Sequence, residues 1–352
     1  MAEYEFLKQL LQSPGVSSFE GLPAGLWREQ ARELGAQVTT DAYGNSFAGF
    51  GEGGGPRVLL AGHIDEIGLL ITYIDESGLL YFTGVGISSG EGLPGQRVRV
   101  VSDSEQVLGV IGRKPAHLTS NDERSKRIKL EGLWIDIGAE DRDDALQRVQ
   151  PGCFAVFEAP VIELSENRWA SKAMDNRIGA YIALEAAGRA AAAGARAQII
   201  AAATTQEEIA GVGANVATYG IRPDLAIALD LTHASDVPDV EKKTQGDIRL
   251  GKGPVIELGA TIHQSLAKRI RECAQREEIP FQTGFSGRRT ATDADDIAKV
   301  RYGAPTILIS VPNRYMHSPS EVVDLNDVEG AVLLLERFLC GLEGMEDLLP
   351  GQ

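Results

Sequence analysis

The stretch Arg57-Val58-Leu59-Leu60-Ala61-Gly62-His63-Ile64-Asp65 decides the fold of this 352-residue chain. Residues 57–61 predict a buried strand, because short apolar runs of this kind are typical of the interior of a parallel sheet. The stretch ends in two polar groups, His63 and Asp65. Side chains two residues apart in an extended segment point the same way, so we expect both groups on one side of the strand end.

Helices and strands alternate in the sequence before and well after this stretch. The alternation predicts an α/β fold with a mixed, mostly parallel sheet that is covered by helices on both faces. Helices are expected at 3–12, at about 20–34, at 177–193, near 263–277 and near 327–341, and strands at 197–203, 225–229, near 254–258 and near 305–310.

The segment between Gly68 and residue 165 has a different pattern. Short apolar or alternating runs follow one another between Gly, Pro and Asp turns, which predicts a small all-β, barrel-like domain. Because His63 precedes this segment and its expected partners follow it, residues 1–67 and 166–352 should form one catalytic α/β domain, with 68–165 inserted. Strands are expected at 68–74, 79–82, 97–101, 107–111, 133–137 and 153–157, with one short helix near 141–149.

The composition excludes several classes of partner. The chain carries 50 acidic and 34 basic residues and a formal net charge of −16, so we expect neither nucleic acid nor an anionic membrane as a partner. Its longest basic cluster, 124–127, lies among acids and is interpreted as a solvated loop. Three cysteines without paired spacing, the absence of a signal-like start and the lack of an apolar span of ~20 residues predict a soluble, cytoplasmic protein.

Five potential metal ligands are scattered along the chain near predicted strand ends or, in one case, at a helix start. A single histidine or aspartate at such a place is usually structural. Ligands of open α/β sheets, however, bind beyond the carboxyl ends of the strands, so these five side chains should meet. Two imidazoles and three carboxylates suit a pair of divalent ions, with Asp175 as the carboxylate shared between them. The five are His63, Asp175, Glu208, Asp230 and His317.

The pair Glu207-Glu208 suggests how catalysis would be divided between two residues. If the pair lies in an extended segment, its side chains point in opposite directions. Glu208 would then bind metal, while Glu207 would face the attacking water as the general base. Asp65 would support the imidazole of His63 from behind, as carboxylates do at many metal sites.

At the level of motifs, the chain resembles the tetrahedral and glutamyl aminopeptidase family of dinuclear metallopeptidases. The resemblance covers nearly the whole length, including the inserted β domain, and departs mildly from the family pattern after Glu208 and before Asp175. The matching runs are Gly62-His63-Ile64-Asp65-Glu66-Ile67-Gly68, Ala173-Met174-Asp175-Asn176-Arg177, Gln206-Glu207-Glu208, Ala228-Leu229-Asp230-Leu231-Thr232-His233-Ala234 and Arg314-Tyr315-Met316-His317-Ser318-Pro319.

The resemblance implies the same ligands, with Glu207 as the base and Asp65 as the supporting acid. It also implies two divalent ions in each subunit, with Zn²⁺ or Co²⁺ expected first and Mn²⁺ as another option. Family members form dimers through the inserted domain, and often closed twelve-subunit tetrahedral particles. A homo-oligomer built from dimers, possibly a dodecamer, is therefore expected.

The sequence thus predicts a metal-dependent aminopeptidase that removes N-terminal residues from short peptides with a free N-terminus, using a metal-bound water or hydroxide activated by Glu207. The alternative is a dinuclear metal deacylase of N-acylated amino acids or peptides on the same scaffold. A glycosidase fits poorly, because adjacent glutamates cannot flank a bond from facing sides. A non-catalytic binding protein is disfavoured by the complete ligand set. Two roles stay open at this point: His233 either supports the metal ligands or makes a structural hydrogen bond, and Arg288-Arg289 either approach a substrate carboxylate or belong to a solvated loop.

Overall fold

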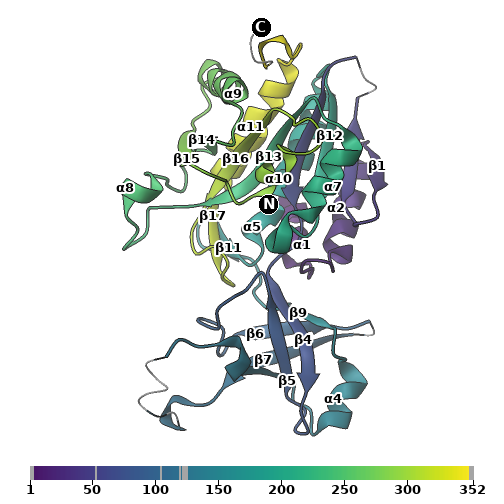
Figure 1. Ribbon diagram of the computed structural model, residues 1–352, viewed down its shortest axis with the longest axis vertical. Helices are drawn as coiled ribbons and strands as arrows, with labels where there is room; N and C mark the ends of the chain where they lie inside the picture. Colours follow the sequence, from purple (N-terminus) through teal and green to yellow (C-terminus); the bar gives the residue numbers. More distant parts are fainter. Residues whose placement is uncertain (1–3, 52–53, 104, 119, 121–125, 349–352) are drawn as a thin grey trace.

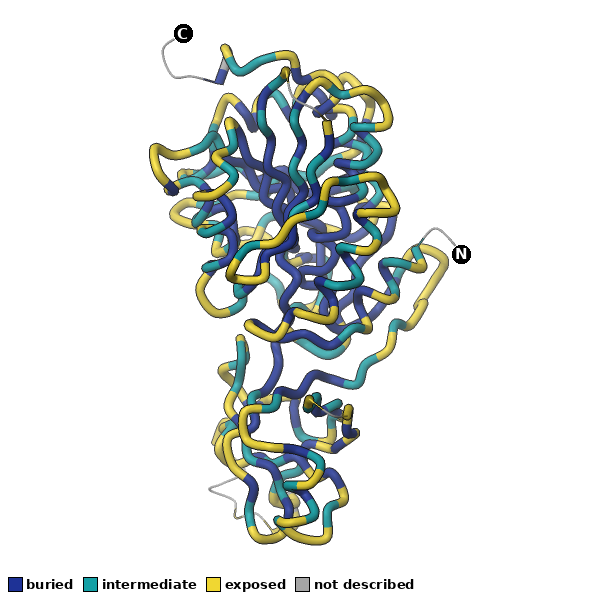
Figure 2. The backbone as a smooth tube through the Cα atoms, turned by 90° about the vertical axis from the view of Figure 1, so that its right-hand side faces the viewer, coloured by how far each residue is buried: buried dark blue, intermediate teal, exposed yellow. Residues whose placement is uncertain are grey.

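The computed structural model describes residues 4–51, 54–103, 105–118, 120 and 126–348, so Arg124 and Ser125 of the basic cluster lie outside the described residues. The chain forms a large α/β body and a smaller β-barrel that extends below it in Figure 1. Buried backbone runs through the centre of both parts (Figure 2).

An eight-stranded sheet forms the centre of the α/β body. The strands β12, β3, β13 and β16 pair in parallel, and the antiparallel pairs lie toward the two edges, which confirms the predicted mixed, mostly parallel sheet. In order across the sheet, the strands are β1 (Gln37–Thr40), β2 (Ser46–Phe50), β12 (Gln198–Thr204), β3 (Arg57–His63), β13 (Leu225–His233), β16 (Thr306–Asn313), β14 (Val255–Gly259) and β15 (Gln282–Ser286).

Helices cover both faces of this sheet (Figure 1). The long, alanine-rich α5 (Met174–Ala192) packs on β3, β12 and β13, and α11 (Leu325–Cys340) packs beside it. The same layer contains α1 (Glu5–Gln12), α2 (Gly21–Glu33) and α9 (Gln264–Arg276), and the other face carries α7 (Val212–Ile221) and α10 (Asp293–Ile297). Short helices α6 (Glu207–Ala210) and α8 (Lys242–Gln245) lie in the connections.

Two glycines let α5 approach the end of the sheet very closely. A Cβ atom on Gly62 would lie 2.3 Å from the carbonyl carbon of Gly179, and one on Gly179 would lie 2.5 Å from the carbonyl oxygen of Leu229. No larger side chain fits between these backbones. The close approach brings the first residues of α5 next to the ends of β3 and β13.

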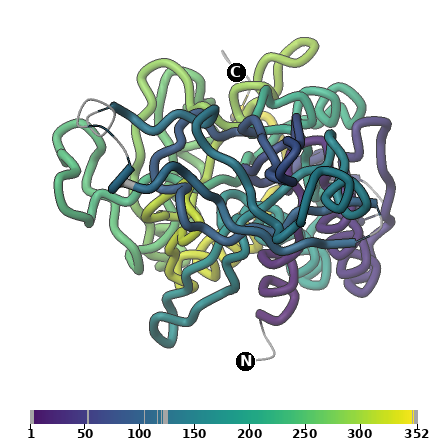
Figure 3. Tube along the Cα trace, turned by 90° about the horizontal axis from the view of Figure 1, so that it is seen from below, coloured from purple at the N-terminus to yellow at the C-terminus, as the bar shows by residue number. Residues whose placement is uncertain are grey.

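The predicted small all-β part is a closed barrel whose strands lie between residues 68 and 157. Six strands close in the order β4-β5-β8-β7-β6-β9 around a hydrophobic core of their own, and they lie in front of the α/β body when the molecule is seen from below (Figure 3). The strands are β4 (Gly68–Ile74), β5 (Leu80–Val85), β6 (Arg97–Val101), β7 (Gln106–Arg113), β8 (Leu133–Asp136) and β9 (Phe154–Phe157), and α4 (Arg142–Arg148) lies beside them.

A three-stranded sheet leads the chain back from the barrel to the α/β body. Its strands are β10 (Ile162–Glu163), β11 (Arg168–Ser171) and β17 (Glu321–Asp324), all antiparallel. Because β11 ends just before α5 begins, this small sheet sets the point from which α5 starts. The sequence analysis did not predict it.

Among the described residues, no helix combines the length and the apolar composition that a membrane crossing requires.

Candidate metal centre

The structure brings all five predicted ligands and Glu207 to one cavity of about 870 Å³ at the carboxyl ends of the central strands. His63 is the last residue of β3, Asp230 lies within β13, and His317 follows β16. Asp175 comes from the start of α5 and the two glutamates from α6. Residues that are far apart in the sequence thus share a single solvent-accessible pocket.

Asp175 lies between the two imidazoles. Its Oδ1 is 3.2 Å from Nε2 of His63, and its Oδ2 is 3.3 Å from Nε2 of His317. Each oxygen therefore faces a different histidine. Such an arrangement allows one carboxylate to contact two cations at once.

Two further carboxylates complete a group around each histidine. Oε2 of Glu208 lies 3.4 Å from Nε2 of His317, and Oδ1 of Asp230 lies 4.0 Å from Nε2 of His63. Oε2 of Glu207 is 3.7 Å from the same nitrogen of His63. We call the six residues His63, Asp175, Glu207, Glu208, Asp230 and His317 the acidic centre.

The local backbone differs from the sequence-based expectation at the glutamate pair. The extended segment predicted for Glu207 and Glu208 is wrong, because both residues begin the four-residue helix α6 after Gln206, whose φ is +58°. Their side chains are separated by a helical step rather than by strand alternation. The start of α5 also differs, since Asp175 has a non-helical ψ of 106°. Asp230 is not a strand end either, because β13 continues to His233.

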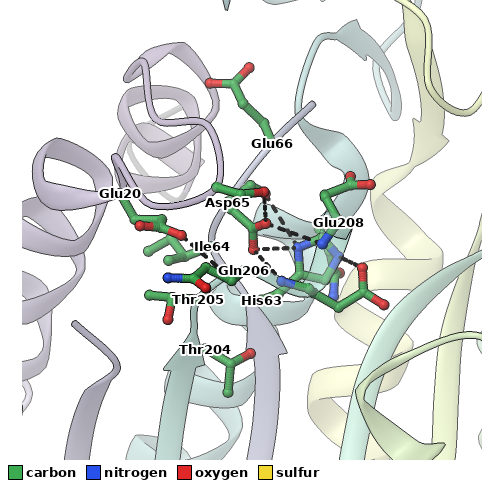
Figure 4. Close-up of polar contacts among 12 residues, drawn as sticks. Glu20, His63, Ile64, Asp65, Glu66, Thr204, Thr205, Gln206 and Glu208 are labelled. Carbon is green, nitrogen blue, oxygen red and sulfur yellow. Dashed lines mark hydrogen bonds and ion pairs between the residues drawn. The ribbon is translucent and has the colours of Figure 1, made fainter. Parts of the chain in front are cut away.

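Asp65 connects the end of β3 to the glutamate pair (Figure 4). Its Oδ1 is 3.3 Å from Nδ1 of His63 and accepts a hydrogen bond from the Glu207 N–H at 3.2 Å. Its Oδ2 accepts from the Glu208 N–H at 3.2 Å and from the Ser17 hydroxyl at 2.7 Å. Asp65 is fully buried, and it orients both an imidazole and the backbone of α6.

Glu321 performs a corresponding task on the other side, and the sequence analysis missed it. Its Oε2 accepts a hydrogen bond from the Asp175 N–H at 3.0 Å, and its Oε1 accepts from the His317 N–H at 2.8 Å. The side chain is only 2% exposed. One buried carboxylate therefore holds the backbones of Asp175 and His317. Its position four residues after His317 is the only sequence signal that could have suggested it.

The histidines and Asp175 stabilise one another's charged forms. Burial lowers the pKa of His63, but the charge of Glu207 and contacts with Asp175 and Asp65 outweigh it and leave that pKa well above its usual value. Its contact with Asp175 raises the pKa of His317. Burial opposes ionisation of Asp175, yet the two histidines hold its pKa well below the usual range.

The other carboxylates of the acidic centre lack this compensation. Burial, followed by the charge of Asp175, raises the pKa of both Glu208 and Asp230 well above the usual range. Burial also raises the pKa of Glu207 to about 7; His63 opposes this rise, and Asp293, Asp175 and Asp65 add to it. The acidic centre therefore contains more negative charge than its two histidines can balance.

The donor set and the surplus of negative charge fit divalent cations. The oxygen Oε1 of Glu208 is buried and has no hydrogen-bond partner among the described residues, which is unfavourable unless something else contacts it. Imidazole nitrogens and carboxylate oxygens are the ligands that zinc and similar ions take in hydrolases. Among the described residues, the ligand atoms of His63, Asp175 and Glu208 lie within 4.8 Å of one another, as do those of His63, Glu207 and Asp230, so each group could hold one ion. His317, which is 3.3 Å from Asp175 and 3.4 Å from Glu208, lies beside the first group.

A second charged cluster lies just beneath the acidic centre and is fully paired. Glu66, Lys172 and Arg177 are buried, and we call them the buried ion network. The Lys172 ammonium is 2.8 Å from both oxygens of Glu66, and Nη2 of Arg177 is 2.9 Å from Oε1 of the same residue. The remaining N–H groups of Arg177 donate to the carbonyls of Leu10, Ser13, Gly15 and Ile64.

The loop that contains the arginine pair is fixed near the acidic centre. The buried Asp293 accepts a hydrogen bond from the Thr204 hydroxyl at 2.6 Å, where Thr204 is the β12 residue paired with His63. Arg289 lines the cavity, whereas Arg288 is not among the described residues that do so. His233 is exposed and lines the same cavity.

Comparisons with known proteins agree along nearly the whole chain. The model of the M42 glutamyl aminopeptidase family matches residues 44–334. The lysyl aminopeptidase of Pyrococcus furiosus is 34% identical over 349 residues, which cover 98% of this chain and 99% of that protein.

Solved structures show the same similarity. The TET aminopeptidase of a marine sediment archaeon of the Thaumarchaeota has a TM-score of 0.92 at 31% identity, covering 98% of this chain and 97% of that one. The TET1 peptidase of Pyrococcus horikoshii has a TM-score of 0.84 at 35% identity, covering 96% and 99%. The chain therefore belongs to the M42 glutamyl aminopeptidase family.

Proposed function

We propose that this protein is a dinuclear metal-dependent aminopeptidase that removes N-terminal residues from short peptides. The observation that carries the proposal is the position of Asp175, whose two oxygens face two different histidines at 3.2 and 3.3 Å. A carboxylate in this position is suited to bridge two cations. Zn²⁺ and Co²⁺ are the ions that we expect first, because the ligands are imidazoles and carboxylates.

When bound, two divalent ions supply Lewis acidity for the scissile carbonyl and lower the pKa of the attacking water. His63, Asp175, Glu208, Asp230 and His317 would hold these ions. Asp65 and Glu321 keep the ligands in place through the hydrogen bonds described above. The rigid supports matter because small displacements of reacting groups reduce rates strongly.

Glu207 is the proposed general base. Its carboxyl lines the cavity, and its pKa of about 7 allows it to exchange a proton near neutral pH, although bound cations would lower that value. Glu207 would take a proton from the attacking water and pass it to the nitrogen of the leaving peptide. Its neighbour Glu208 cannot share this task if it binds metal.

The carboxylates of the acidic centre also explain a preference for the end of a peptide. The α-ammonium group of a substrate would lie against Asp230 and its neighbours, where negative charge is concentrated. A peptide bond in the middle of a chain has no such group to place there. The acidic centre would thus select substrates with a free N-terminus.

Substitution of Glu207 tests the assignment of the base. The variant Glu207→Gln should bind the same amount of metal as the wild type but lose at least ~10³-fold in kcat, because the proton acceptor is removed. Metal content is measured by elemental analysis, and turnover with an aminoacyl chromogenic substrate. Glu272→Gln, an exposed change on α9, serves as the control. Full activity of Glu207→Gln would contradict the proposal.

A deacylase on the same scaffold remains the alternative function, and the substrate's α-nitrogen distinguishes the two. An aminopeptidase should cleave an aminoacyl substrate with a free amine and leave its N-acetyl derivative intact, and a deacylase should do the reverse. Activity that survives complete chelation and dialysis would contradict both readings and would favour metal-free carboxylate chemistry.

We also propose that the barrel forms a dimer contact. Leu108 and Val110 on the outer face of β7 are 63% and 46% exposed, which is unusual for such side chains on a solvated strand. The Pyrococcus horikoshii relative assembles into a tetrahedron or a large octahedral shell, so larger particles built from dimers are expected here too. Sedimentation that returns only monomer would contradict this proposal.

A further inference from the structure

The short helix α6 carries both glutamates of the acidic centre, yet it is too short to be stable by itself. Forming a single helical turn costs more conformational entropy than its first hydrogen bond returns, so isolated turns do not persist in water. In addition, the two glutamates bring like charges close to Asp175. The direction in which Glu207 and Glu208 point must therefore be set by contacts from outside the helix.

The side chain of Asn45 makes such contacts on both sides of α6. This residue directly precedes β2 and is fully buried. Its Oδ1 accepts a hydrogen bond from the Thr205 N–H at 2.9 Å, just before α6. Its Nδ2 donates to the carbonyl oxygen of Gly213 at 3.0 Å, shortly after α6. One amide group thus ties together the two chain segments between which the helix lies.

We propose that Asn45 is a positioning residue of the reaction, which fixes the direction of Glu207 and Glu208 by clamping the segment 205–213. This inference rests on the proposed aminopeptidase function and deepens it. Within the described chain, Asn45 is not among the residues that line the cavity, whereas Glu207 and Glu208 are. Its action on the reaction is therefore indirect and passes through the backbone of α6.

The neighbouring Asp41 determines which way the amide of Asn45 faces. Its Oδ2 accepts a hydrogen bond from Nδ2 of Asn45 at 2.7 Å, and its Oδ1 accepts from the Asn45 N–H at 3.2 Å. Because the Gly213 carbonyl and an ionised carboxylate can only accept, the amide nitrogen must face them, and the amide oxygen must face the Thr205 N–H. Position 45 thus requires a donor and an acceptor on one short planar group, which an ionised aspartate could not supply.

The two clamped segments also contact each other directly, without room for a further side chain. The Gly213 N–H donates to the Thr205 carbonyl at 3.0 Å. A Cβ atom on Gly213 would lie 2.2 Å from that carbonyl oxygen and 2.6 Å from Oδ1 of Asn45. The Thr205 hydroxyl has two acceptors within reach, the Tyr43 carbonyl at 3.1 Å and Oδ1 of Asn45 at 3.2 Å. The residues between these contacts, 207–211, line the cavity.

Asn45 differs from the two carboxylates that also hold this segment. Asp65 and Glu20 accept hydrogen bonds from its first N–H groups, those of residues 206–208. The amide of Asn45 also reaches the far end, at Gly213. Without it the helix would be anchored at its start alone, and a displacement of ~1 Å in a reacting group can lower a rate by ~10²-fold.

The variants Asn45→Ala and Ser46→Ala form a matched pair. Ser46 is adjacent and equally buried, but its hydroxyl accepts a hydrogen bond from Arg28 at 3.0 Å and does not act on α6. With the metal-loaded enzyme and an aminoacyl chromogenic substrate, we expect Asn45→Ala to lower kcat by about 10²-fold and to change KM much less, because Glu207 is displaced. Ser46→Ala should leave both values close to those of the wild type.

Two measurements without turnover test the clamp itself. Hydrogen exchange of the metal-free protein should be faster for residues 205–213 in Asn45→Ala and unchanged in the barrel. Calorimetric titration with Zn²⁺ should show an affinity about tenfold lower, as is usual when a group supporting a ligand is changed. Thr205→Val keeps the shape of the side chain and removes its hydroxyl. It should show the same changes to a smaller extent, and it keeps the test available if Asn45→Ala does not fold.

Two results would overturn the assignment of Asn45. One is an Asn45→Ala variant with the kcat and the Zn²⁺ affinity of the wild type. The other is an equal loss in Ser46→Ala, since general destabilisation would then account for both variants. If the wild type cleaved no aminoacyl substrate, while Asn45→Ala still showed faster exchange and weaker Zn²⁺ binding, the clamp would be supported and the proposed aminopeptidase function would be contradicted.

Discussion

The acidic centre and the buried ion network lie next to each other and handle buried charge in opposite ways. In the network, one glutamate is matched by two cations, and each partner has hydrogen bonds at 2.8–2.9 Å. In the acidic centre, four carboxylates share two histidines, and an oxygen of Glu208 has no partner among the described residues. The comparison shows which cluster is complete by itself and which one requires a ligand.

The energetics of buried charge indicate that the buried ion network is structural and that the acidic centre binds a ligand. A buried charge without a partner is strongly unfavourable, so a structural cluster is expected to be neutral and fully hydrogen-bonded. The network comes close to that expectation, because its carboxylate is paired with two hydrogen-bonded cations and only one positive charge is left over. The acidic centre departs from it in the lining of a cavity, where strained or unpaired groups usually serve function.

The largest expected effect comes from breaking the network. Arg177→Met should lower the free energy of unfolding by about 3–5 kcal/mol, because it leaves Glu66 underpaired and several buried carbonyls without a donor. Urea unfolding of the metal-loaded protein measures the change. The control is Arg189→Met, since Arg189 and Glu329 form a partly exposed pair that should contribute less than ~1 kcal/mol. Equal losses of unfolding free energy in Arg177→Met and Arg189→Met would show that the buried ion network contributes no more to stability than an ordinary surface pair.

The next largest effect is the dependence of stability on pH that Glu20, just outside the acidic centre, should cause. Burial, and then the charge of Asp65, raise the pKa of Glu20 from 4.5 to about 7. Since the Glu20 carboxyl then binds more protons in the folded state than in the unfolded state between these values, its contribution to stability is greatest below pH 4.5 and is lost as pH rises to about 7. Glu20→Gln should remove ~2 kcal/mol of this decline, because one pKa unit corresponds to ~1.4 kcal/mol.

The Glu20 variant is informative because it should keep the local structure. Oε1 of Glu20 accepts the hydrogen bonds from the N–H groups of Ser18 and Gln206, and the amide oxygen of glutamine can do the same. Chemical denaturation at pH 5 and at pH 7.5 provides the measurement. A wild-type protein that gains stability over this range relative to Glu20→Gln would show that the sign is wrong.

A smaller effect is expected at the carboxylate that holds two ligands. Glu321→Gln replaces one acceptor by an amide NH₂, so either the Asp175 N–H or the His317 N–H loses its partner. We expect metal affinity to fall about tenfold, or ~1.4 kcal/mol, as is usual when a group supporting a ligand is changed. Calorimetric titration with Zn²⁺ measures it. Unchanged affinity would mean that Glu321 has only a structural role.

The smallest effect has the opposite sign. Glu208→Gln should stabilise the metal-free protein by about 1 kcal/mol, because it removes a buried negative charge that Asp175 repels. The same variant should retain less metal than the wild type. Thermal unfolding in the presence of a chelator tests the first point. If Glu208→Gln were less stable than the wild type without metal, the charge of Glu208 would be balanced within the protein, as the charge of Glu66 is in the buried ion network.

The strands that were predicted correctly are those in which burial sets the order of apolar and polar residues. β6 was predicted at 97–101 and β4 at 68–74, with the observed bounds: β6 shows the alternation of a strand with one buried face, and β4 is a short, mostly apolar run that begins at a glycine. The central strand β3 was recognised because its apolar run is buried on both faces. Short and polar elements such as β15 lack either signal, and they were missed.

The functional residues also divide into those that the sequence identified and those that it missed. Side chains with metal-binding chemistry at strand ends could be named from the sequence, and the structure brings them to one cavity. Glu321 was not, because it acts through backbone N–H groups, one of them 146 residues away at Asp175, and its spacing of four residues from His317 is not distinctive. The helical turn at Glu207 was missed because four residues are too few to show a period of 3.6.

The ion pair between Glu66 and Lys172 has a consequence for engineering. Glu66 lies two residues before the barrel begins, and Lys172 follows β11, where the chain has rejoined the α/β body. The two chain crossings are therefore clamped together at 2.8 Å by residues that belong to the body. Insertions are tolerated best where their two ends are close. The barrel can thus be regarded as an exchangeable module, and grafting a different domain in place of residues 68–157, with β10 and β11 retained, offers a way to alter assembly without rebuilding the acidic centre.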